Sequence, residues 1–140
     1  MSDTLEGERL AGALVALSHH VVHLFTEVGR TVRLSQQQVR LLCAINACGS
    51  VGMSELGRRT QLEKSNLSNL VDRLEQRGLA VRKRDPNDRR VTYVELTEEG
   101  TELAVRSHTE VVARVNKMAG KLLPEDQARL TAAVDRMMAD

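Results

Sequence analysis

The chain has 140 residues, a formal net charge of +1, and one Phe and one Tyr as its only aromatic residues. This length suits one compact domain that buries a core without disulfides or metals. A core so poor in aromatic side chains must consist of Leu, Val, Ala and Met, and these residues favour helices. No apolar run approaches the ~20 residues of a membrane span, and the acidic start MSDTLE is unlike a signal peptide, so we expect no membrane partner and a cytoplasmic location.

The first part of the chain predicts one long helix. Apolar residues recur at intervals of three and four over residues 10–28, a stripe that predicts a helix ending near Gly29. Val15, Val22 and Phe25 lie off this stripe. Because a helix that is apolar on more than one side usually has more than one packing partner, we infer a partner subunit.

Residues 35–78 predict one helix followed by a helix-turn-helix. The segment SQQQ at 35–38 has the pattern of a capping box and opens a helix that continues to Gly49. After a short break at 49–52, residues 53–60 predict a two-turn helix, residues 61–63 a tight turn, and residues 64–77 a helix that Gly78 ends in the C′ position. This spacing is typical of a helix-turn-helix.

The pattern changes after Gly78. Residues 79–84 and 91–96 are short β-prone runs, and the turn-forming segment DPND at 85–88 separates them, so they predict a hairpin. Thr97 supplies an N-cap for a long helix, and Pro124 suits the first turn of a last helix. The expected fold class is mainly α with a small β-hairpin wing.

Charge is distributed unevenly along these elements. Residues 58–90 carry ten Lys or Arg and five Asp or Glu, a balance of +5, whereas residues 1–57 sum to −1 and residues 91–140 to −3. A basic segment in an otherwise acidic chain is typical of a face that meets a polyanion, although random clustering on a solvated surface is the simpler alternative.

The predicted helix at 64–77 is the candidate for major-groove recognition, because helix-turn-helix proteins place their second helix there. Its polar side chains can pair with base edges or phosphates. An ordinary amphipathic surface helix would also have a polar outer face, so this feature alone is weak. The predicted DNA-contacting residues of this helix are Lys64, Ser65, Asn66, Ser68, Asn69 and Arg73.

The predicted hairpin is stronger evidence for DNA binding than the helix at 64–77. Five cations on one small β-turn repel each other unless an anion balances them, and a hairpin tip is narrow enough to enter the minor groove, where guanidinium groups are attracted. Its predicted DNA-contacting cations are Arg82, Lys83, Arg84, Arg89 and Arg90.

A family resemblance rests on these same segments. Residues 85–100, DPNDRRVTYVELTEEG, resemble the MarR wing signature D-P-x-D-x-R-x-x-x-V-x-L-T-x-x-G. Upstream, SEL at 54–56, LVDRL at 70–74 and RGL at 77–79 resemble the helix-turn-helix of that family. Two positions depart from the family pattern: Glu63 stands where a Ser, Thr or Asp N-cap is common, and Asn69 where a basic residue is frequent.

The resemblance implies a single MarR-type domain at 1–140, with a winged helix-turn-helix DNA-binding lobe at 30–100 and dimerisation helices at 5–29 and 101–140. It implies a homodimer that binds a pseudo-palindromic operator on double-stranded DNA, usually as a repressor that a small ligand, such as a phenolic compound, or oxidation releases. It also implies that Asp88 braces the wing and that Arg90 or Arg89 reaches the minor groove.

The family resemblance places an organic effector in the cleft between the dimerisation helices and the DNA-binding lobe. A polar group that borders apolar helices orients an anionic aromatic compound. The candidate lining residues are His20, Leu24, Arg40 and His108.

Cysteines and histidines leave two alternative sensors open. Cys43 and Cys48, five residues apart on one helix, would lie about 140° apart with a rise of about 7.5 Å, too far for an intrahelical disulfide. His19 and His23 have the i, i+4 spacing of metal ligands, with His108 as a conceivable third. No carboxylate or cysteine cluster completes a metal site, so we expect no metal and no cofactor.

Other classes of protein fit less well. The chain lacks a phosphate loop, a nucleophile elbow and a zinc-ligand signature, so we expect no enzyme. A winged-helix module for protein contacts would present an acidic or apolar recognition face. A single-strand or RNA binder would carry stacking aromatics, for which only Tyr93 is available.

Overall fold

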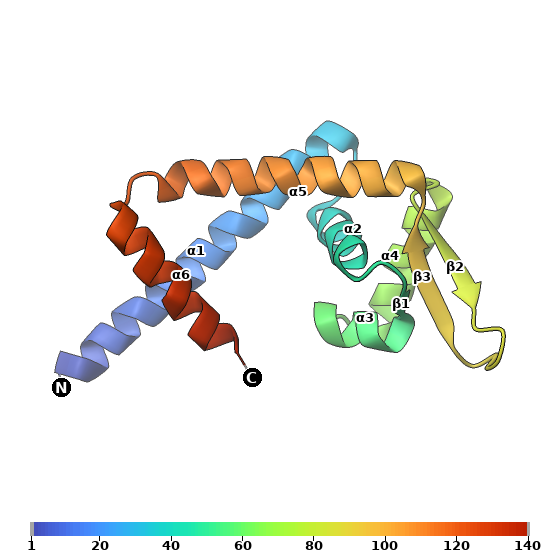
Figure 1. The fold of residues 1–140 in the computed structure, drawn as a ribbon, viewed down its shortest axis with the longest axis horizontal. Helices are drawn as coiled ribbons and strands as arrows, with labels where there is room; N and C mark the ends of the chain where they lie inside the picture. The colour runs from blue at the N-terminus through green and yellow to red at the C-terminus, as the bar shows by residue number, and fades with distance from the viewer. Residues whose placement is uncertain (1, 140) are drawn as a thin grey trace.

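The computed structural model describes residues 2–139. Helices and short strands form two parts, a lobe around a small sheet and an arm of helices that includes both ends of the chain (Figure 1). The expected class, mainly α with a hairpin wing, is confirmed. Along the chain the elements are α1 (Ser2–Val32), α2 (Gln36–Cys48), β1 (Val51–Gly52), α3 (Met53–Thr60), α4 (Lys64–Gln76), β2 (Ala80–Arg84), β3 (Thr92–Leu96), α5 (Glu98–Ala119) and α6 (Pro124–Met138).

Helix α1 continues to Val32, beyond the predicted end at Gly29. Gly29 is buried inside the helix, where a Cβ atom would lie 2.4 Å from the carbonyl oxygen of Leu34. The glycine therefore permits close approach of the chain that leaves α1. The turn itself falls on Arg33, which adopts a left-handed φ of 60°.

Helix α2 forms the centre of the lobe. The predicted capping box is present, because the Ser35 hydroxyl accepts from the backbone N–H of Gln38 and the Gln38 side chain accepts from the backbone N–H of Ser35. The buried side of α2 packs against the other lobe elements and the first half of α5. Fully buried members of this core include Val39, Leu42, Ile45, Leu56, Val71, Leu74 and Val94.

The sheet is antiparallel with the order β1-β3-β2. Strands β2 and β3 form the predicted hairpin, with Ala80 opposite Leu96 and Arg84 opposite Thr92. Strand β1 was not predicted. It consists of two residues, and Val51 pairs with Val94 on the far edge of β3. The wing is therefore tied to the helix-turn-helix by a strand as well as by its own connection.

Helix α5 begins against this sheet. Thr97 caps α5 by accepting from the N–H of Gly100, and its own hydroxyl donates to the carbonyl of Gly78. Gly100 is buried so tightly that a Cβ atom there would lie 1.9 Å from the carbonyl oxygen of Leu79. The start of α5 is thus fixed on the strand that leads into the wing.

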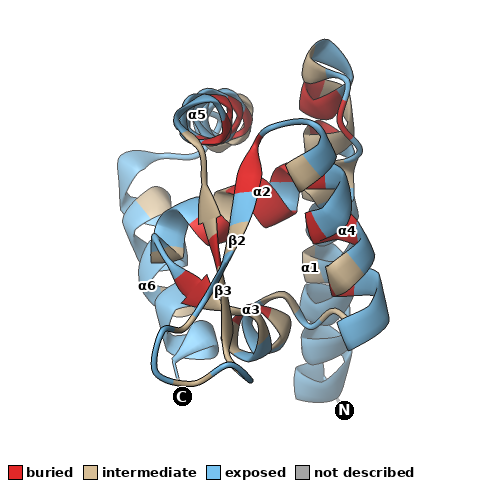
Figure 2. Cartoon of the chain, turned by 90° about the vertical axis from the view of Figure 1, so that its right-hand side faces the viewer, coloured by how far each residue is buried: buried red, intermediate tan, exposed pale blue. Residues whose placement is uncertain are grey.

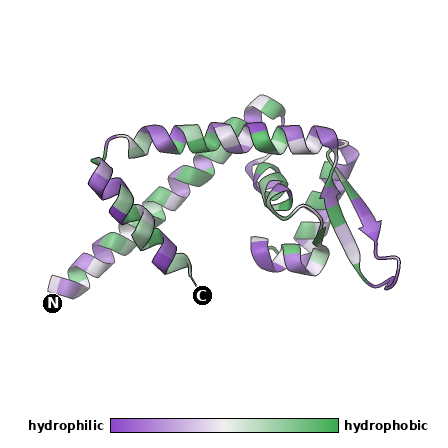
Figure 3. Ribbon diagram, viewed as in Figure 1, coloured by the Kyte–Doolittle hydropathy of each residue, from purple (hydrophilic) through white to green (hydrophobic). Residues whose placement is uncertain are grey.

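The arm exposes much of its apolar surface. Burial is concentrated in the lobe, whereas α6 has no buried residue and is mostly pale blue in Figure 2. Figure 3 shows hydrophobic residues along α1, α5 and α6 outside the lobe. Among residues 2–139, no helix has the length and hydropathy needed to cross a membrane. The exposed large apolar residues of the arm include Leu5, Leu10, Val15 and Leu17 of α1, Val105 and Val112 of α5, and Leu130, Val134, Met137 and Met138 of α6.

Candidate nucleic-acid interface

Helix α4 has a buried side and a polar side. Leu67, Leu70, Val71 and Leu74 are buried against the lobe and fix the orientation of the helix. No side chain caps its N-terminus at Glu63, which leaves the first backbone N–H groups free for an anion such as phosphate. Of the predicted DNA-contacting residues on this helix, the exposed ones are Lys64, Ser65, Asn66, Asn69 and Arg73.

Arg82 and Ser68 face each other instead of solvent. The Arg82 guanidinium donates to Asp72 Oδ1 at 2.6 Å, to the Glu75 carboxylate, and to the carbonyl oxygen and hydroxyl of Ser68 at 3.1 and 3.2 Å. Burial by itself would lower the pKa of Arg82, but Asp72 and Glu75 outweigh it and raise the pKa. These contacts make Arg82 a brace between α4 and the wing. The predicted contacts of Arg82 and Ser68 with DNA stay predictions.

Two aspartates order the wing turn. Asp85 Oδ1 accepts from the N–H of Asn87 at 2.8 Å, and its Oδ2 accepts from the Tyr93 hydroxyl at 3.2 Å. Asp88 Oδ1 accepts from the backbone N–H of Arg90 at 3.0 Å and from its Nε at 3.2 Å. The backbone and side-chain hydrogen bonds from Arg90 lower the pKa of Asp88. These hydrogen bonds join Asp88 to Arg90 within the wing turn.

The cations of the interface differ in how far they are neutralised. Lys83 pairs with Glu95 at 2.8 Å, whereas the Arg90 side chain pairs with Asp88 but is 91% exposed. Within residues 2–139, no ion pair engages Lys64 and Arg73 on α4 or Arg84 and Arg89 on the wing. These four cations and Arg90 are exposed to solvent, and their predicted contacts with DNA stay predictions.

Arg77, which follows α4, joins this helix to the end of α1. Its guanidinium donates from Nη1 to the carbonyl oxygen of Arg33 at 2.8 Å and from Nη2 to that of Val32 at 3.2 Å. It thereby satisfies carbonyl groups at the C-terminal end of α1, where a cation is favourable. In the sequence, this position was noted only for its match to the family pattern. The contact spans more than forty residues, so no local pattern could predict it.

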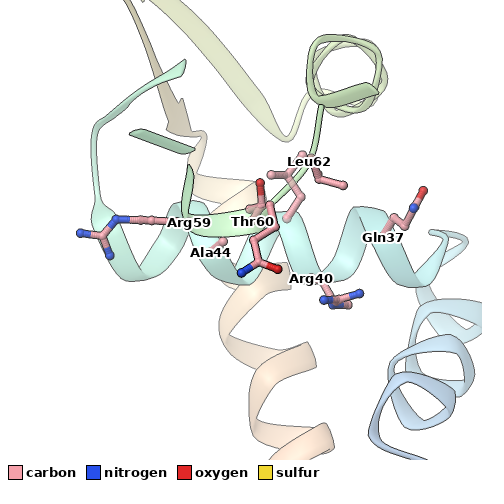
Figure 4. Close-up of a pocket in the computed structure, with 8 residues that line it drawn as sticks. Gln37, Arg40, Ala44, Arg59, Thr60 and Leu62 are labelled. Carbon is pink, nitrogen blue, oxygen red and sulfur yellow. The ribbon is translucent and has the colours of Figure 1, made fainter. Parts of the chain in front are cut away.

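The four predicted effector-lining residues have different surroundings. His20 and His108 are exposed, and Leu24 is buried with Val28 and Val111 between α1 and α5. Arg40 instead lines a hollow of about 260 Å³ between α2 and α3, which we call the α2–α3 hollow (Figure 4). Its lining consists of Gln37, Arg40, Leu41 and Ala44 from α2, Arg59 and Thr60 from α3, and Gln61 and Leu62 from the turn.

The candidate sensor residues have other surroundings. His23 Nε2 lies 2.8 Å from Glu27 Oε1, and the other oxygen of Glu27 accepts from Arg114 of α5 at 2.7 Å. Residues 2–139 contain no group of three or more His, Cys, Asp or Glu side chains placed to hold a metal ion. Both cysteines are free thiols, and burial raises the pKa of Cys43, which disfavours its reactive thiolate.

Helices α3 and α4, the hairpin β2–β3 and the strand β1 define a winged helix-turn-helix protein. Comparison with known proteins agrees with this fold. Residues 34–92 match the model of the MarR family, and this match covers most of the lobe. Over this segment the chain is similar to proteins of the MarR family.

The similar proteins extend the likeness beyond the lobe. The homoprotocatechuate degradative operon repressor of Escherichia coli is 24% identical over 132 residues, which cover 94% of this chain and 89% of that protein. A mutant MarR from E. coli complexed with operator DNA has a TM-score of 0.79 at 21% identity, covering 96% of each chain. BpsR of Bordetella bronchiseptica, whose DNA binding 6-hydroxynicotinic acid regulates, has a TM-score of 0.78 at 21% identity, covering 94% of this chain and 99% of BpsR.

Proposed function

We propose that this protein is a cytoplasmic, dimeric transcription regulator that binds a specific double-stranded DNA operator, acts as a repressor, and is released by a small aromatic acid. The observation that carries the proposal is the pairing of an exposed polar helix, α4, with a wing whose cations Arg84, Arg89 and Arg90 remain available for phosphates. Helices α3 and α4 and the hairpin lie at one end of the molecule (Figure 1). One duplex can therefore engage the helix in its major groove and the wing tip in the adjacent minor groove.

The apolar surface of the arm supports the homodimer. Leu10 of α1 is 58% exposed, Met137 of α6 is 59% exposed, and Leu123 just before α6 is 64% exposed. Exposed apolar patches of this kind mark protein interfaces. A two-fold dimer built on α1 and α6 would present two recognition helices to a pseudo-palindromic site.

Small-molecule release is proposed from the relatives. The E. coli relative is named as the repressor of an operon that degrades homoprotocatechuate, and 6-hydroxynicotinic acid regulates the DNA binding of BpsR. Both compounds are hydroxylated aromatic acids. The cleft between the dimerisation helices and the lobe, bordered by His20, Leu24, Arg40 and His108, stays the predicted effector site.

Operator binding can be tested directly. The protein is titrated onto the DNA upstream of its own coding sequence and onto a random duplex of equal length, at several salt concentrations. We expect tighter binding to the upstream DNA and an affinity that falls with salt, because phosphate contacts release counterions. Equal affinity for both duplexes, or no dependence on salt, would refute specific regulation.

The wing is tested by Arg90→Ala, which should weaken operator binding while the protein remains a folded dimer. Arg106→Ala is the matched control, because Arg106 is exposed on α5 outside the wing and the helix-turn-helix. If Arg90→Ala binds the operator as the unchanged protein does, the proposed role of the wing is wrong.

A further inference from the structure

The polar side of α4 divides into a flank that meets the wing and a middle that faces outward. The flank consists of Ser68, Asp72 and Glu75, and all three side chains accept from Arg82 of β2. Their acceptor groups are therefore already engaged within the protein. An α-helix turns by about 100° per residue, so Asn69 points about 150° away from the centre of the buried side of α4. Asn69 thus lies in the middle of the outward face.

The side-chain amide of Asn69 is free of partners in the protein. In the part of the chain that the structure describes, the side chains of α4 that form hydrogen bonds are those of the wing-side flank, and Asn69, which is exposed, is not among them. Asparagine is a weak helix former, because its amide competes for backbone hydrogen bonds. A free amide in the middle of a helix lowers helix stability without contributing to the fold, as is typical of functional surfaces.

Two free cations flank Asn69 along the helix. Lys64 begins α4 and Arg73 lies about one turn beyond Asn69, and within residues 2–139 neither cation forms an ion pair. Their long side chains can reach phosphates, which position a protein on the duplex, whereas contacts to base edges specify the sequence. The side chain of Asn69 is short and lies between them. In the proposed complex it is therefore placed at a base edge in the major groove.

An amide distinguishes adenine from the other bases. It carries a donor NH₂ and an acceptor oxygen side by side. Adenine presents the acceptor N7 next to the donor N6, which matches both groups, whereas guanine presents two acceptors, and cytosine and thymine one polar group each. We propose that Asn69 reads one adenine in each operator half-site through N7 and N6, and thereby sets the base preference at that position. This inference rests on the proposed function, because it names a base of the operator.

The first test changes the DNA one base pair at a time. Affinity is measured for the upstream duplex and for duplexes in which each A·T pair of the half-site is replaced by G·C, or its adenine by 7-deazaadenine, which lacks the N7 acceptor but still pairs with thymine. At the adenine read by Asn69 we expect G·C to weaken binding by about 5- to 150-fold and 7-deazaadenine by about 2- to 12-fold. Full affinity for every 7-deazaadenine duplex would overturn the contact.

Asn69→Ala assigns this preference to one side chain. The variant should bind the unchanged and the replaced duplexes equally at that position and keep the pattern at all others. Asn46→Ala is the matched control, because Asn46 is exposed on α2 and borders β3 and the start of α5, and it should keep the whole pattern. Circular dichroism verifies the fold of both variants. An adenine preference that survives in Asn69→Ala, or an equal loss for all duplexes, would show that Asn69 reads no base.

Asn69→Arg should reverse the preference. A guanidinium has two donors that match N7 and O6 of guanine, so at this position the G·C duplex should bind about 5- to 150-fold more tightly than the A·T duplex. The added charge strengthens binding to every duplex, so the ratio of the two affinities is the measurement. Asn46→Arg adds the same charge on α2 and should leave the ratio as in the unchanged protein. A ratio that still favours adenine in Asn69→Arg would contradict the inference.

The same titrations separate this inference from the proposed function. Specific binding to the upstream duplex, with a base pattern that Asn69→Ala leaves intact, would overturn the role of Asn69 and leave the regulator standing. Equal affinity of the unchanged protein for the upstream duplex and a random duplex would overturn both.

Discussion

Substitution of Gly100 by alanine should destabilise the lobe without touching any surface proposed to meet DNA. The added Cβ atom would lie 1.9 Å from the Leu79 carbonyl oxygen and 2.9 Å from its carbonyl carbon. Real Cβ atoms stay at least 3.0 Å from such neighbours, so the first turn of α5 and Leu79 must separate by about 1 Å. The obstacle is backbone, and no change of side-chain rotamer relieves it.

The size of the effect follows from what this movement strains. Forced overpacking costs about 1–3 kcal/mol. The same Leu79 carbonyl accepts from the N–H of Thr97 at 3.0 Å, and weakening this hydrogen bond costs about 1 kcal/mol. We therefore expect Gly100→Ala to lower the free energy of unfolding by about 2–4 kcal/mol.

Urea unfolding measured by circular dichroism tests this value, with all variants at one protein concentration because dimerisation adds to stability. Gly57→Ala is the matched control, because its Cβ atom would meet Leu67 Cδ2 at 3.6 Å, an ordinary contact. Alanine in helix α3 should raise stability by about 0.5–1 kcal/mol. A loss below about 1 kcal/mol in Gly100→Ala, or an equal loss in both variants, would refute the close-packing argument.

Three further predictions concern the wing. Arg82→Met should lower the free energy of unfolding by about 1–3 kcal/mol. Urea unfolding of the double variant that also carries Glu75→Gln should show a smaller loss than the sum of the losses in the two single variants. If the two losses simply add, Arg82 and Glu75 do not act together as a brace. Because the pKa of Asp88 is lowered, its bonds to Arg90 should persist above about pH 4 and break as pH falls through the lowered value. An Arg90 amide shift that titrates at the ordinary aspartate pKa would contradict this. Arg89→Ala should reduce the salt slope of operator binding by about 1, and an unchanged slope would show that Arg89 meets no phosphate.

Local signals in the sequence were sufficient for most of the fold. The capping box at Ser35, the turn at Gly78 and the N-cap at Thr97 are all made by residues within a few positions of each other, and each is present in the structure. Gly29 misled the prediction for a physical reason. The sequence shows a glycine that can end a helix, whereas its role is to let the Leu34 backbone approach.

Features that depend on distant partners could not be predicted in this way. Strand β1 exists because Val51 meets Val94, and its two residues have no periodicity to detect. Arg82 was grouped with the other wing cations by charge alone, and only the fold shows that Asp72 and Glu75 neutralise it. The position of Arg40 in the α2–α3 hollow likewise depends on how α3 and its turn pack on α2.

The contact of Arg77 with the end of α1 makes that helix a lever. Helix α1 has 31 residues and is therefore about 46 Å long. A rotation of about 5° at one end moves the other end by about 4 Å, which is close to the rise of ~3.4 Å per base pair of DNA. In the proposed dimer, a slight change in the angle between the two arms would thus shift the recognition helices by a whole base-pair step. The arm would therefore set the spacing between half-sites as much as the lobe does.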